Sequence, residues 1–251
     1  MRKLIAAISA VVALLLPAGA QSQLISYGKP DKFLEMQAHL LMGGSYVTEN
    51  YKSCFKEISD VNNSMGFAWG LGFRAKFNIT SFVGIGTELN YLRNTGKLDM
   101  AVTKEGDPNV SNVFIKNNFR TFNVPIFASF TFNLAPSVKW TADGGLFMSF
   151  GIGGKQKRTE YNAKVNEVGQ LVTNISHYKT DYYKSDRGFL NSYRDFDMGL
   201  HLGTGLTFMN KVALGVRCQF GFRNVAMGTS TAKVTPNSHN VNIFATAGYI
   251  F

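Results

Sequence analysis

The sequence predicts an all-β fold, an eight-stranded antiparallel up-and-down transmembrane β-barrel with short periplasmic turns and long external loops. Three observations lead to this prediction. Eight segments alternate apolar and polar residues, short and long connections alternate between them, and an export signal precedes them. The composition agrees with fine mixing of the two residue classes, because 45% of the 251 residues are hydrophobic while the mean hydropathy is −0.04.

The first twenty residues have the features of a secretory signal peptide. Arg2 and Lys3 precede an uncharged apolar run over residues 4–16, and Ala18 and Ala20 occupy positions −3 and −1 of a cleavage site. The alternative is a membrane anchor, but a spanning helix needs about 20 apolar residues. We therefore expect a signal peptide over 1–20, a periplasmic lead-in over 21–33 and an outer-membrane barrel over 34–251.

The first four predicted strands cover residues 34–44, 65–78, 83–91 and 119–132. The second shows the clearest alternation. Its six odd positions from Phe67 to Phe77 are all apolar, whereas glycines and basic residues separate them. The apolar faces of the other three begin at Met36, Val83 and Phe122 and continue at every second residue with few exceptions.

The last four predicted strands cover residues 138–150, 196–208, 212–224 and 241–251. Their apolar faces begin at Val138, Phe196, Val212 and Val241. A few large apolar residues interrupt the polar faces of the eight strands, and these are Leu41, Phe127, Phe147, Phe244 and Ile250. Each segment is about as long as a tilted membrane strand requires.

The connections alternate in length along the chain. Short links are expected at 79–81, 133–137 and 209–211, and long links at 45–64, 92–118, 151–195 and 225–240. Both chain ends then lie on the short-turn side, as expected of a chain inserted into the membrane from the periplasm.

Alternation alone does not say which face points inward. A soluble lipocalin-type barrel would turn its apolar face toward a ligand, whereas a membrane barrel turns it toward lipid. Two features favour lipid outside. Glycines gather on the polar face, where a narrow barrel needs small residues, and aromatic residues such as Trp140 and Phe208 lie near the short-turn ends, where a membrane barrel has its interfacial belt.

Several short motifs resemble a known family. They are Asn123-Val124-Pro125-Ile126, Phe196-Asp197-Met198-Gly199 with Gly203-Thr204-Gly205-Leu206, and Tyr249-Ile250-Phe251 at the end of the chain. With them, nearly the whole mature chain resembles the PorT-like outer membrane protein beta-barrel domain family, often described as porin-family proteins of the Bacteroidota. The resemblance implies an outer-membrane location and, for PorT itself, a role in protein secretion. Tyr249 and Phe251 also resemble the C-terminal signature by which the barrel-assembly machinery recognises such chains for insertion.

The expected inward face carries a set of charged residues. They are Arg74, Lys76, Glu88, Lys139, Asp143, Asp197, His201 and Arg217. We interpret them as a lumen charge network that plugs the barrel, because charges away from water must be paired and eight strands leave little interior space. The alternatives are a path for small solutes and a catalytic lumen.

No pattern in the sequence indicates an enzyme. Asp197 and His201 share a face but lie about 13 Å apart along a strand, and no Gly-x-Ser-x-Gly, His-Glu-x-x-His or P-loop motif occurs. We therefore expect no catalytic site, no cofactor and no metal. Cys54 and Cys218 are expected to be unpaired.

The link over 151–195 is the most individual segment of the chain. It holds eight basic against five acidic residues and five tyrosines. Such a segment suits contact with lipopolysaccharide phosphates, glycans or an envelope protein partner, although a solvated hairpin would explain it equally well. Nucleic acid is not an expected partner of an exported chain. The hypotheses are a structural or partner-binding barrel, a narrow solute channel, a PorT-like secretion accessory and a soluble periplasmic ligand-binding barrel.

Overall fold

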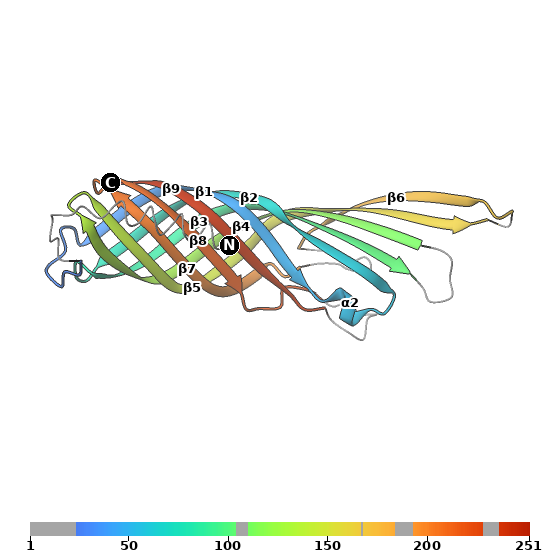
Figure 1. Cartoon of the computed structure of the whole chain (residues 1–251), viewed down its shortest axis with the longest axis horizontal. Coiled ribbons are helices and arrows are strands. Elements are labelled where there is room, and N and C mark those ends of the chain that lie inside the picture. The colour runs from blue at the N-terminus through green and yellow to red at the C-terminus, as the bar shows by residue number, and fades with distance from the viewer. Residues whose placement is uncertain (1–23, 104–109, 167, 184–192, 228–235) are drawn as a thin grey trace.

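A computed structural model describes residues 24–103, 110–166, 168–183, 193–227 and 236–251, so the predicted signal peptide lies outside the described residues. Nine antiparallel strands form one sheet among them (Figure 1): β1 (Leu34–Glu49), β2 (Ile58–Asn78), β3 (Val83–Thr103), β4 (Val110–Ala135), β5 (Val138–Val165), β6 (Leu171–Asp181), β7 (Phe196–Phe208), β8 (Val212–Gly221) and β9 (Ser238–Ile250). Eight of them follow the order β4-β3-β2-β1-β9-β8-β7-β5, and a β4–β5 pairing closes the ring. The predicted eight-stranded antiparallel barrel is confirmed, and β6 is an additional strand that pairs with β5.

The prediction of long loops at 45–64, 92–118 and 151–195 is wrong for much of their length. β2 and β3 stay paired as far as Ile58 and Val102, and β4 and β5 as far as Val110 and Ala163. β2 to β6 therefore continue beyond the closed ring as an extension, in which the β5–β6 hairpin reaches furthest (Figure 1).

The apolar face of the strands changes sides where the extension begins. In the ring, Ile85 and Leu89 of β3 face outward and are 51% and 56% exposed. Further along the same strand, Leu98 and Met100 occupy the opposite phase and are buried. A strand with a single phase would end at this inversion, which is why the predicted strand over 83–91 is shorter than β3.

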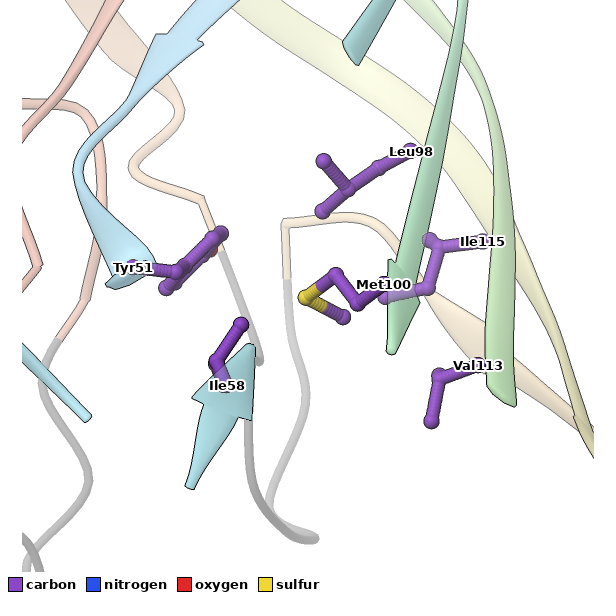
Figure 2. Packing of buried hydrophobic residues seen from close by; sticks show 6 residues of the cluster. All are labelled: Tyr51, Ile58, Leu98, Met100, Val113 and Ile115. Carbon is purple, nitrogen blue, oxygen red and sulfur yellow. The ribbon is translucent and has the colours of Figure 1, made fainter. Parts of the chain in front are cut away.

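The extension has an apolar core of its own. Tyr51 of the short helix α2 (Tyr51–Cys54) and Ile58 of β2 pack against side chains of β3 and β4, as Figure 2 shows; the cluster consists of Tyr51, Ile58, Leu98, Met100, Val113 and Ile115. Burying an apolar side chain of this size stabilises a fold by roughly 1.5–3 kcal/mol. This cluster explains how the strands stay ordered where the barrel is no longer closed.

Large apolar side chains remain exposed around the outside of the ring. They include Met36, Leu40, Phe67, Leu71, Phe73, Ile85, Leu89, Phe122, Ile126, Leu146, Phe150, Met198, Leu202, Leu214, Phe220 and Ile243. Soluble proteins rarely expose a contiguous apolar surface of this extent. The arrangement is the membrane alternative of the sequence prediction, with apolar residues outside and polar residues inside. Within the described residues, no helix is long and apolar enough to span a membrane.

Candidate functional site

Four charged side chains meet in the middle of the barrel lumen. Arg74 holds Asp143 through two hydrogen bonds, from Nη1 to Oδ2 at 2.7 Å and from Nη2 to Oδ1 at 3.1 Å. Arg217 Nη2 lies 2.8 Å from Glu88 Oε1, and Arg74 Nη1 lies 3.7 Å from the same oxygen. We call Arg74, Glu88, Asp143 and Arg217 the ionic quartet. Its formal charges cancel, and each residue is at most 5% exposed.

Neutral polar side chains surround the ionic quartet. Asn90 donates to Glu88 Oε2 at 3.1 Å, and Ser129 accepts from Arg74 Nη2 at 3.3 Å. His39 Nε2 lies 2.9 Å from Asn90 Oδ1 and 3.7 Å from Glu88 Oε2. These contacts satisfy polar atoms that the narrow lumen removes from water.

Phe127 crosses the lumen beside the ionic quartet. The Arg74 guanidinium lies 4.6 Å from the centre of its ring, and the His201 ring lies 5.4 Å away. Two glycines make room for it. A Cβ on Gly86 would stand 2.5 Å from Cζ of Phe127, and one on Gly145 would stand 2.5 Å from its Cα. Phe127 interrupts the polar face in the sequence, and in the structure its side chain is buried inside the barrel with 2% exposure.

A layer of apolar residues lies between the ionic quartet and the extension. Leu41, Ala68, Leu92 and Phe244 pack together with at most 2% exposure, and Phe147 is equally buried. Leu41, Phe147 and Phe244 interrupt the polar faces of their predicted strands, and Leu92 lies just beyond the predicted strand over 83–91. Their burial means that the inner face is a layered packing of polar and apolar side chains.

Aromatic rings stack on one another at the start of the extension. Phe119 of β4 stacks on Tyr182 with ring centres 4.3 Å apart, and Tyr182 stacks on Tyr193 at 4.5 Å. Val47 and Val225 complete this buried cluster, which we call the aromatic stack. The hydroxyl of Tyr193 donates to Glu49 Oε1 at 2.7 Å, which ties the stack to the end of β1.

Glu49 gives this end of the barrel a pH dependence. Burial raises the pKa of its carboxyl from 4.5 to about 8, and the hydrogen bond from Tyr193 opposes that rise. Because the folded chain keeps a proton that the unfolded chain loses, we expect stability to fall as the pH rises from about 4.5 to about 8 and to level off above. Glu49 as a whole is only partly buried, so the expected loss of stability is about 1–3 kcal/mol.

Urea unfolding in detergent micelles at several pH values measures this slope. Glu49→Gln is expected to flatten it, whereas Glu57→Gln, at an exposed position before β2, should leave it unchanged. An equal slope in wild type and Glu49→Gln would assign the effect to another group.

Four of the eight predicted lumen residues form the ionic quartet, and His201 lies beside it, 3.3 Å from Gln219 through its Nδ1. The other three lie at different heights. Lys76 donates to the Thr131 hydroxyl at 3.1 Å, and Lys139 pairs with exposed Asp31 near the short turns. Asp197 lies toward the other end, where it accepts from Asn240 at 2.8 Å. Asp197 and His201 share no hydrogen bond or ion pair.

A cavity of about 520 Å³ opens at the short-turn end. Lys76, Lys139 and the lead-in residues Lys29 and Lys32 are among the residues that line it. The lead-in is fixed across the short turns, because Gly28 O accepts from Ser81 N at 3.0 Å and Leu24 O accepts from Asn133 N at 3.0 Å.

The residues of the predicted insertion signature lie on the outer side of β9 and at its end. Tyr249 and Phe251 are 48% and 62% exposed, and their rings meet edge to face at 5.5 Å. The backbone of Phe251 is held by β1, since its N–H donates to Met36 O at 2.9 Å, and Lys32 Nζ donates to Phe251 O at 3.1 Å.

Several residues that shape the site were missed by charge-based reasoning. They are Phe127, the neutral residues His39, Asn90 and Ser129 beside the ionic quartet, Gln219 with Asn123, which accepts from it at 2.8 Å, and the aromatic stack with Glu49. Glycine at two positions facing Phe127 is a sequence signal that could have identified it. Cys54 and Cys218 are both free, and the described residues contain no group of three or more His, Cys, Asp or Glu placed to hold a metal.

A family model described as outer membrane protein beta-barrel domain matches residues 20–226. No curated protein is significantly similar to the chain in sequence. Among solved structures, the chain is similar to Ail of Yersinia pestis in complex with the heparin analogue sucrose octasulfate, with 14% identity, a TM-score of 0.38 and coverage of 88% of this chain and 100% of Ail. It is also similar to Neisserial surface protein A (11% identity, TM-score 0.36, 87% and 97% covered). An outer membrane channel of Pseudomonas putida F1 matches with 8% identity, a TM-score of 0.28, and 92% and 99% coverage.

Proposed function

The chain belongs to the outer membrane protein beta-barrel domain family, and from this premise we propose that it is a non-enzymatic outer-membrane barrel with a closed lumen that acts through its extension. The short turns face the periplasm and the extension faces the outside of the cell. This orientation is supported by Leu24 and Phe251, the first and last described residues, which lie at the short-turn end, and by the usual direction of barrel insertion.

The ionic quartet is the observation that carries the closed lumen. It spans the barrel from four strands and leaves no formal charge unpaired within itself. The apolar layer and the aromatic stack follow toward the outside. The cavity beneath the aromatic stack has a volume of about 20 Å³, enough for about one water molecule. The cavity of about 520 Å³ at the short-turn end therefore has no counterpart beneath the stack.

Conductance in planar bilayers tests the closed lumen. Wild-type protein is expected to give no steady current at 100 mV, with insertion established separately by protease protection in liposomes. Tyr182→Ala/Tyr193→Ala should stay closed as well, because the ionic quartet remains beneath the removed rings. Steady open currents from pure wild-type protein would replace this proposal with the narrow channel.

The narrow channel is the second candidate because of the periplasmic cavity. Lys76 points a buried ammonium group at its wall, bonded to a neutral hydroxyl, and three more lysines line the opening. A conducting barrel with this entrance should prefer anions. A reversal potential that stays at zero in a salt gradient would exclude that preference.

The extension is the part that we propose to contact partners. An envelope protein would pair with the edge of β6 that no described strand occupies and would contact the exposed Leu171, Ile175 and Tyr178 on this strand. Removing residues 155–181 while keeping the ring should abolish co-purification of such a partner from gently solubilised outer membranes. An unchanged set of co-purified proteins would exclude the hairpin as the contact.

The PorT-like identity is a finer proposal within the family. The motifs around Asn123, Phe196 and Tyr249 favour it. Deleting the gene and measuring secreted proteins tests it, and unchanged secretion would exclude it.

We also propose Tyr249 and Phe251 as the signal read by the barrel-assembly machinery.

A further inference from the structure

Four lysines lie side by side on the outward face of the extension. The register pairs Lys97 of β3 with Lys116 of β4, Lys116 with Lys157 of β5, and Lys157 with Lys179 of β6. All four side chains are exposed. We call them the lysine row. With about 4.8 Å between neighbouring strands, it extends over roughly 14 Å.

Like charges at directly opposite positions of a sheet are destabilising. Within the described residues, none of these ammonium groups has a carboxylate within 4 Å. The nearest acidic residues on this face are Asp99, opposite Phe114, and Asp181, opposite Lys155. The row is therefore open to a counter-charge from outside the chain, which would relieve this repulsion.

The exposed apolar side chains around the outside of the ring form a lipid-facing belt. The position of the row relative to this belt indicates where the counter-charge would be located. Tyr91 and Phe122 are the last belt residues on β3 and β4, and Arg93 and Arg120, which are paired with each other, follow at the next outward positions. Lys97 and Lys116 come four residues beyond these arginines. With a rise of about 3.3 Å and a tilt of about 40°, the arginines lie about 5 Å and the lysines about 15 Å above the belt.

These heights match the polar layer of an outer leaflet. The headgroup region begins at the belt edge and is about 5–8 Å deep, and the sugars of a glycolipid extend beyond it. We propose that the outward face of β3 to β6 binds the phosphate groups of the lipopolysaccharide-type glycolipid around the barrel. Arg93 and Arg120 contact phosphates at the headgroup level, and the lysine row contacts phosphates on the sugars above.

Charge favours this occupant over others. The outward face carries seven basic residues against Asp99 and Asp181; the basic residues are Arg93, Lys97, Lys116, Arg120, Lys155, Lys157 and Lys179. Arginine binds phosphate oxygens through two parallel hydrogen bonds, and lysine binds them as a point charge. The face is also continuous with the apolar belt, so one glycolipid can lay its chains on the belt and its phosphates on the row. The inference rests on the proposed orientation.

Binding of purified glycolipid to the detergent-solubilised protein tests the site. Wild type should bind phosphorylated lipopolysaccharide, lose most of that binding in high salt, and bind the dephosphorylated form at least about tenfold more weakly. Lys116→Gln/Lys157→Gln, from the middle of the row, should weaken binding about tenfold. The matched control Lys52→Gln/Lys56→Gln removes two exposed charges near α2 and should bind like wild type.

Three results would overturn the proposal: equal binding by wild type and Lys116→Gln/Lys157→Gln, equal binding of the dephosphorylated glycolipid, or the same affinity for inorganic phosphate alone. The orientation is tested apart from the site by an epitope inserted after Asn166, in the β5–β6 turn. Antibody labelling of intact cells is expected. Labelling only after lysis would refute the orientation. The binding measurement in detergent does not depend on the orientation, so it would still test the site.

Discussion

Replacing Glu88 with glutamine is expected to lower the free energy of unfolding by about 3–5 kcal/mol. Glutamine keeps the shape and the hydrogen bond from Asn90 but removes the charge that faces Arg217 at 2.8 Å. The two guanidinium groups would then share Asp143 alone, from which Arg217 Nη1 lies 3.9 Å away. Urea unfolding in detergent micelles, followed by tryptophan fluorescence, measures the loss.

The control is Asp31→Asn, which removes an exposed carboxylate from its pair with Lys139 and should cost at most about 1 kcal/mol. Adding Arg217→Met to Glu88→Gln should restore part of the stability, because it removes the guanidinium left without its partner. Two results would contradict this expectation. Glu88→Gln and Asp31→Asn could lower the free energy of unfolding by the same amount, or the loss from Arg217→Met could add in full to the loss from Glu88→Gln. Either result would mean that the lumen is more hydrated than the packing of the ionic quartet implies.

Replacing Gly145 with alanine is expected to prevent assembly or to cost about 3 kcal/mol or more. The new Cβ would meet Cα of Phe127 at 2.5 Å and the carbonyl oxygen of Ile126. Both belong to the backbone of β4, so no side-chain rotation relieves the clash. The adjacent β4–β5 register would have to shift, and with it the position of Asp143.

Gly144 supplies a matched control one residue away. A Cβ there would have no heavy atom within 4 Å, so Gly144→Ala should assemble like wild type. The measurement is the folded fraction in outer membranes, read from the heat-dependent migration of the barrel in gels. Equal folded fractions for the two variants would show that β4 and β5 can separate locally, contrary to the packing around Phe127.

The ring of eight strands was predictable from sequence because each strand alternates against lipid with one phase. The extension was not, since Leu98 and Met100 occupy the phase opposite to Ile85 and Leu89 on the same strand. A strand that leaves lipid for water must turn its apolar residues inward. A search for such inversions would have continued β3 and β4 beyond Leu92 and Phe119.

The candidate site was predictable as a face but not as a set of contacts. Period-two alternation assigns Arg74 and Lys76 to the same face, but the height of each depends on register, which the turns and packing determine. Arg74 therefore reaches the ionic quartet, whereas Lys76 ends at the cavity of the short-turn end. Charge also gave no reason to select Phe127, because its role depends on glycines in two neighbouring strands.

The continuity of β4 and β5 through both environments has a mechanical consequence. These strands have 26 and 28 residues, against the usual three to ten, and they pass from the ring into the extension as single strands. A pull on the tip of the hairpin would load the interstrand hydrogen bonds of the wall in shear, so that many would have to break together. Under the proposed orientation, a partner bound to the hairpin outside the cell would transmit force along β4 and β5 directly to the wall of the barrel.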